Sequence, residues 1–163
     1  MKKLFLTKAA AIMMTLIFII GISGCGINAP GTKQYVESVK EDMLQAVNYT
    51  RKLKEQQKSL DARSIDSAKE NLETLDTLDD VYTDLLRLES PSAYSELDDE
   101  IKENASSALS YIKELKSLVT TAMNSADDFL YKQDSPHIME QYEKNYSSLV
   151  DLSSQVTTKY RND

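Results

Sequence analysis

The sequence predicts an all-α fold, an antiparallel up-down four-helix bundle. Residues 32 to 163 contain no glycine, where about nine would be expected at the usual frequency. Apolar residues recur in this stretch at steps of three and four, and only Pro91 and Pro136 interrupt it. Because many hairpin turns and nucleotide-binding loops need glycine, the sequence disfavours β-rich, Rossmann and P-loop folds.

The first two helices are expected at residues 33 to 58 and from the mid-sixties to about Leu88. Their stripes consist of Val36, Val39, Met43, Val47 and Leu53 in the first and of Ile65, Ala68, Leu72, Leu75, Leu78, Tyr82 and Leu85 in the second. A polar connection is expected around 58 to 63, where the apolar stripe fades, although no glycine or proline forces a break. One continuous helix over 33 to 89, giving three long helices, is the alternative.

The pairs Ser90-Pro91 and Ser135-Pro136 predict the starts of the last two helices, at 91 to 131 and 136 to about 160. Proline loses no hydrogen bond at a first helical position, and the serine before it can act as a cap. The two stripes consist of Leu97, Ile101, Ala105, Ala108, Ile112, Leu115, Val119, Ala122, Ala126 and Phe129, and of Met139, Tyr142, Tyr146, Leu149, Leu152, Val156 and Tyr160.

The expected third helix does not match the others in length. At 1.5 Å per residue it would be about 60 Å long, against about 40 Å for each of the other three. Either this helix projects beyond the bundle or it bends near Asn124-Ser125. The residues alone do not decide between the two arrangements.

The N-terminus reads as a signal peptide. Lys2, Lys3 and Lys8 precede an uncharged run over 9 to 20, and the small residues of 21 to 24 follow it. Twelve to fourteen apolar residues are too few to span a bilayer, which takes about 20. Cys25 is the single cysteine of the chain.

The four residues Ile22-Ser23-Gly24-Cys25 resemble the lipobox of bacterial lipoproteins. The resemblance implies a diacylglycerol on the Cys25 sulfur and cleavage between Gly24 and Cys25, and it leaves N-acylation of Cys25 open. It divides the chain into a cleaved signal peptide (1–24), a lipidated cysteine with a flexible tether (25–32) and a helical bundle domain (33–163). We therefore expect a protein anchored by lipid to the extracytoplasmic face of the cell membrane.

Removal of the signal peptide makes the chain more acidic. The whole sequence has 19 Lys and Arg and 26 Asp and Glu; the signal takes three lysines, which leaves 16 − 26, a net charge of −10. Such a chain is not expected to bind nucleic acid or anionic headgroups through charge. Lipid on Cys25 would hold it at the membrane.

No residue set specifies a reaction, so we expect no catalytic residues, no metal and no cofactor. His137 is the only histidine, which excludes zinc and di-iron sites built on two histidines. The carboxylate groups Asp79-Asp80, Asp98-Asp99-Glu100 and Asp127-Asp128 lack the spacing of a calcium loop. They are expected to lie at helix starts or on solvated faces.

Tyrosine supplies most of the aromatic residues of the bundle domain. Because tyrosine is favoured at interfaces, one hypothesis is an interaction surface that includes Tyr94, Tyr111, Tyr142 and Tyr146. The alternative is packing at the bundle edge, with the ring buried and the hydroxyl in water.

The domain loosely resembles small, uncharacterised helical lipoproteins of Gram-positive bacteria, in which a proline turn followed by a tyrosine opens a long helix, as in Ser90-Pro91-Ser92-Ala93-Tyr94. The resemblance implies no activity. We expect a non-enzymatic interaction module that binds another envelope protein, as an accessory, immunity or stress-related factor. A bundle that carries or senses an apolar ligand is the alternative, and an envelope enzyme is a minor one.

Replacing Cys25 with alanine tests the lipobox. The Cys25→Ala variant should accumulate as an unprocessed precursor without lipid, because both the acylated sulfur and the cleavage site are lost. Metabolic labelling with a fatty acid, followed by mass spectrometry of the N-terminus, measures this. Normal maturation of the variant would contradict the assignment.

Overall fold

The computed structural model describes residues 31–60, 64–125 and 127–162. These ranges form α2 (Thr32–Ser59), α3 (Ile65–Arg87), the short 3-10 helix η1 (Ser92–Tyr94), α4 (Ser95–Ser125) and α5 (Phe129–Asn162), with no strand among them. The predicted all-α class and the four helices are confirmed. The signal peptide with Gly24, and the tether with Cys25 up to residue 30, lie outside the described residues.

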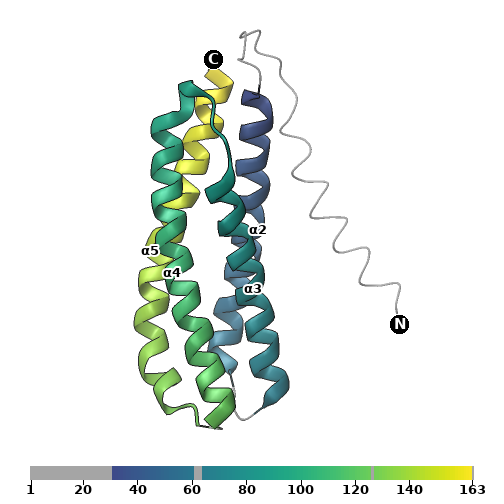
Figure 1. Ribbon diagram of the computed structural model, residues 1–163, viewed down its shortest axis with the longest axis vertical. Helices are drawn as coiled ribbons and strands as arrows, with labels where there is room; N and C mark the ends of the chain where they lie inside the picture. Colours follow the sequence, from purple (N-terminus) through teal and green to yellow (C-terminus); the bar gives the residue numbers. More distant parts are fainter. Residues whose placement is uncertain (1–30, 61–63, 126, 163) are drawn as a thin grey trace, which may run out of the picture.

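The four helices run alternately up and down (Figure 1). Each packs against the helix that follows it, and α5 closes the ring against α2. We call the end where α2 and α4 begin the proximal end, and the end where α3 and α5 begin the distal end. None of the described helices is both long and apolar enough to cross a membrane.

The core is a single cluster with contributions from all four helices. Its fully buried large side chains include Leu53 of α2, Leu75, Leu78 and Leu85 of α3, Ile101, Ile112 and Leu115 of α4, and Leu149 of α5. Most of them lie on the predicted stripes, because a 3-4 spacing keeps one face of a helix directed at its neighbours. The second helix differs from the prediction: Asn71 is buried, Leu72 is only half-buried, and Ile65, at the start of the predicted stripe, is exposed because it is the first residue of the helix.

The connection between α2 and α3 begins where it was predicted. The last helical residue of α2 is Ser59, and Leu60 has extended backbone. Helix α3 then begins after Ser64, whose Oγ accepts a hydrogen bond from the Ser67 backbone N–H at 3.3 Å. This cap satisfies one of the free N–H groups of the first turn. One continuous helix over 33 to 89 is therefore not formed.

The expected helix boundary at Ser135-Pro136 is wrong. Helix α4 ends at Ser125, near the bend considered as an alternative, and α5 begins at Phe129, so Pro136 lies inside α5. The turn has its own polar signals: Ser125 Oγ donates to the Thr121 carbonyl at 2.8 Å, and Asp127 Oδ1 accepts from the Phe129 N–H at 3.0 Å. Helix α4 is therefore shorter than the expected helix of about 60 Å, because residues 129 to 131 belong to α5.

Pro91 does mark a helix boundary, as predicted. It precedes η1, whose Tyr94 N–H donates to the Pro91 carbonyl at 2.8 Å, and α4 follows directly. Leu88 to Pro91 connect the end of α3 to the start of α4 at the proximal end (Figure 1).

Replacing Pro136 with alanine tests this placement. Pro136 is exposed and is the eighth residue of α5, so it removes an interior helical hydrogen bond to the Lys132 carbonyl. The Pro136→Ala variant should be more stable by about 1–3 kcal/mol in urea unfolding. Pro91→Ala, which lies before η1, is the control and should not stabilise. A neutral Pro136→Ala would instead fit a helix that begins at Pro136.

Candidate functional site

The four tyrosines of the predicted interaction surface do not form one surface. Tyr142 and Tyr94 are buried, with 0% and 1% of their area exposed, whereas Tyr111 and Tyr146 are half-buried. Tyr142 and Tyr146 stack with ring centres 6.2 Å apart, and Tyr94 packs 5.7 Å from Tyr35 at the proximal end. Tyr94 and Tyr142 therefore serve the interior of the bundle, since their rings complete the core.

A chain of hydroxyl groups crosses the middle of the bundle. The Tyr142 hydroxyl of α5 lies 2.5 Å from Thr50 Oγ1 of α2 and 2.8 Å from the Tyr82 hydroxyl of α3. Burial raises the pKa of Tyr142 to about 12 and raises the pKa of Tyr82 well above its usual value. All three groups are therefore neutral and paired, which suits a structural role rather than proton transfer near pH 7.

A buried carboxylate ties the proximal end together. Asp98 of α4 is 3% exposed, accepts a hydrogen bond from the Tyr35 hydroxyl at 3.0 Å, and lies 2.7 Å from Lys102 Nζ. Burial, together with Asp98, raises the pKa of Tyr35. Lys159 near the end of α5 lies over the Tyr94 ring, 5.2 Å from its centre. These contacts join the start of α2 to α4 and the end of α5.

Three of the other carboxylates that were considered for metal binding make structural contacts, whereas Asp80, Asp99 and Glu100 are exposed. Asp79 pairs with Lys116 at 3.1 Å, Asp127 caps α5, and Asp128 lies 2.5 Å from Lys132 Nζ. His137 is exposed on α5. Within the described ranges, no three His, Cys, Asp or Glu side chains are grouped to hold a metal ion.

Acidic residues are concentrated on two adjacent helices. Helix α3 has seven acidic and two basic residues and α4 has six and three, whereas α2 has four and six and α5 four acidic and four basic. The side of the bundle formed by α3 and α4 is therefore the more negative one.

One carboxyl group on α2 has a shifted pKa. Burial raises the pKa of Asp42 to about 6, and the nearby carboxylates of Asp84 and Glu41 raise it further.

Among the described residues, the most exposed large apolar side chains lie at the distal end. Ile65, the first residue of α3, is 58% exposed, and Phe129 and Leu130, the first two residues of α5, are 65% and 52% exposed. Within 31–60, 64–125 and 127–162, the other two exposed large apolar residues are Leu44 and Val150, which are 39% and 37% exposed and lie along the helices. Helices α3 and α5 are not neighbours in the ring, so Ile65 and the Phe129-Leu130 pair lie on different sides of this end. We call the three residues together the distal apolar patch.

The sequence prediction missed this patch for a specific reason. Phe129 continues the apolar spacing of α4, so it was assigned to the core stripe of a longer helix. Helix α4 ends at Ser125 and a new helix begins at Phe129, so the spacing of the α4 stripe no longer applies and Phe129 lies exposed at the start of α5. The sequence did contain a signal for the exposure of Phe129 and Leu130, since these residues directly follow Asp127-Asp128. An aspartate that caps a helix places the next residues in the first turn, which is often exposed.

A surface hollow of about 390 Å³ lies at the proximal end. The first turns of α2, with Gln34 and Tyr35, form one side, and the segment from Leu88 to Pro91 forms the other. Its walls are partly polar and it is open to solvent. Its position is outside the leucine-rich core.

Comparison of the chain with protein families, curated proteins and solved structures gives no match.

Removing the Tyr142 hydroxyl tests the buried hydroxyl chain. The Tyr142→Phe variant should lose about 1–2 kcal/mol in urea unfolding, because it leaves two buried hydroxyls short of a partner. Tyr82→Phe removes one end of the chain and should cost less, and the double variant should cost less than the sum of the two. Tyr111→Phe is the matched control, because the Tyr111 ring is half-buried. Equal losses for Tyr111→Phe and Tyr142→Phe would contradict the assignment.

Proposed function

We propose that this protein is a non-enzymatic, lipid-anchored protein of the extracytoplasmic membrane face that binds another envelope protein through the distal end of its bundle. The proposal combines the lipobox-like residues Ile22-Ser23-Gly24-Cys25 with the position of the distal apolar patch. Accessory, immunity and stress-related roles all fit such a module.

The single observation that carries the binding role is the distal apolar patch. Three large side chains more than half exposed at one end of a small bundle are unfavourable in water, at roughly 25 cal/mol for each Å² of apolar area. Phe129 and Leu130 are neighbours in the chain, and adjacent exposed apolar side chains are typical of binding surfaces. Aromatic and large aliphatic side chains are also the residues that most often dominate binding energy.

The direction of the bundle supports the same role. Gly31, near the end of the expected tether, lies at the proximal end, and the patch lies at the other end of helices about 45 Å long (Figure 1). An anchor at Cys25 would leave the distal end facing away from the membrane. The patch would then be accessible to a partner in the envelope.

Carriage of an apolar ligand inside the bundle is less well supported. The centre of the core is filled by leucine and tyrosine side chains, and its hydroxyls pair with one another. A ligand would have to displace these contacts. We therefore retain the interaction module as the proposed function.

Changing the patch tests this function in cells. Phe129→Ser with Leu130→Ser should keep the fold, because both side chains are exposed and such substitutions usually change stability by less than about 0.5 kcal/mol. It should reduce capture of the partner at least about tenfold, which corresponds to about 1.4 kcal/mol. The readout is crosslinking in living cells from a photoreactive amino acid at Ile65, followed by mass spectrometry of the captured protein.

The matched control is Leu44→Ser with Val150→Ser, which changes the two other exposed apolar residues by the same chemistry. It should leave crosslinking from Ile65 unchanged. Equal loss in both double variants, or crosslinks only between copies of this chain, would contradict the proposed partner. Membrane fractionation of every variant tests the anchor separately.

A further inference from the structure

An asparagine occupies a core position of α3. Asn71 falls on the buried face between Ala68 and Leu75, and its side chain is 0% exposed. Neither its Nδ2 nor its Oδ1 has a hydrogen-bond partner among the described residues. A buried amide in this state is unfavourable by about 1–3 kcal/mol, because it lost its water and gained nothing in return.

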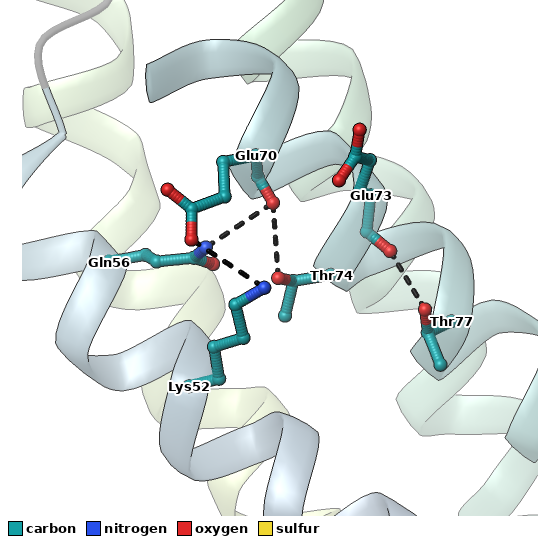
Figure 2. A network of polar contacts seen from close by, with 6 residues as sticks. All are labelled: Lys52, Gln56, Glu70, Glu73, Thr74 and Thr77. Atoms are coloured by element: carbon teal, nitrogen blue, oxygen red, sulfur yellow. Dashed lines mark hydrogen bonds and ion pairs between the residues drawn. The ribbon is translucent and has the colours of Figure 1, made fainter. Parts of the chain in front are cut away.

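Two glutamines near the end of α2 share this condition. Gln56 Oε1 and Gln57 Nε2 are also buried without a partner within the described ranges. Their other atoms are bound: Gln56 Nε2 donates to the Glu70 carbonyl of α3 at 3.3 Å, and Gln57 Oε1 accepts from the Tyr131 hydroxyl of α5. Figure 2 shows Gln56 reaching from α2 to the residue that precedes Asn71. The distal contact between α2 and α3 is therefore only partly hydrogen-bonded.

The surface contacts of this region do little to compensate. Lys52 and Glu70, which bridge α2 and α3 beside Gln56 in Figure 2, lie 3.6 Å apart and are 43% and 60% exposed. Exposed ion pairs of this kind contribute between zero and about 1 kcal/mol. Ile65, at the start of α3, is largely exposed and adds little apolar burial.

The polar groups in the middle of the bundle, by contrast, have hydrogen-bond partners. Thr50, Tyr82 and Tyr142 join α2, α3 and α5 through paired hydroxyls in the middle of the bundle. Leu53, Leu75 and Leu78 around them are completely buried. Contacts in the middle of the bundle are thus satisfied, whereas those at the distal end of α2 and α3 are satisfied only in part.

From this contrast we infer that the distal end of the α2–α3 pair, residues 54–59 and 64–73, opens as a local unit while the rest of the bundle stays folded. Opening exposes the amides of Asn71, Gln56 and Gln57 to water, and the hydrogen bonds they gain offset part of the lost burial. The middle layer at Thr50 and Tyr82 limits the opening. This device is independent of any partner and goes beyond the proposed function.

Hydrogen exchange of the lipidated protein, purified in detergent and followed by mass spectrometry, tests the opening. Backbone amides of 54–59 and 68–73 should exchange at least about tenfold faster than those of the distal ends of α4 and α5, residues 120–125 and 132–137. The compared segments lie at the same distance from their helix ends, and 68–73 and 132–137 both begin at the first hydrogen-bonded amide of the helix, so simple fraying predicts equal rates. Equal rates would overturn the inference, and this comparison needs no variant.

A substitution at Asn71 identifies the cause. Asn71→Leu removes the unpaired amide at nearly constant size, and it should slow exchange of 64–73 by about tenfold and raise the urea midpoint. The control is Asn104→Leu on α4, because the Asn104 amide already donates to the Glu100 carbonyl. It should leave exchange of 64–73 unchanged. Faster exchange in Asn71→Leu would mean that the amide is satisfied in solution, and it would overturn the inference.

Discussion

The hydrogen bonds of the Tyr142 hydroxyl hold three helices in one relative position. Apolar side chains pack without strong direction, so a core of leucine and alanine tolerates small shifts of one helix along another. Hydrogen bonds to Thr50 of α2 and Tyr82 of α3 are directional, and both exist only when α5 lies at one height and one rotation. The bonds between Tyr35, Asp98 and Lys102 do the same for α2 and α4 at the proximal end. These contacts therefore determine which residues reach the two ends of the bundle.

Much of the fold could be predicted from the sequence because helical periodicity depends on local spacing. The absence of glycine after Gly31, the stripes and the turn near residue 60 all led to helices that the structure contains. The boundary at Pro136 was wrong, since proline favours a helix start but an exposed proline is tolerated inside a helix held by tertiary contacts. The turn before α5 depends instead on Asp127, a single capping side chain among many acidic residues.

The candidate sites could be predicted less well, because burial depends on contacts between distant residues. Tyr94 and Tyr142 have the same residue type as the half-buried Tyr111 and Tyr146, and only the packing of other helices separates the two pairs. Asn71 was passed over in favour of Leu72 because a polar residue is not expected in a core. Phe129 was assigned to the wrong helix, so its exposure could not be anticipated. In each case the missing information was which face of a helix its neighbours cover, and this depends on how each helix is rotated about its own axis.

The separation between the proximal and distal ends has a consequence for binding strength. A tether of about 25 Å at most, followed by a rod of about 45 Å, would confine the distal apolar patch of an anchored molecule to a thin layer above the membrane. A membrane partner whose own contact site lies in that layer would meet the patch by diffusion in two dimensions. Confinement to one layer raises the effective concentration of the patch around such a partner without adding a contact. Three exposed side chains, too few for tight binding in free solution, would then be enough to keep the two molecules associated for much of the time.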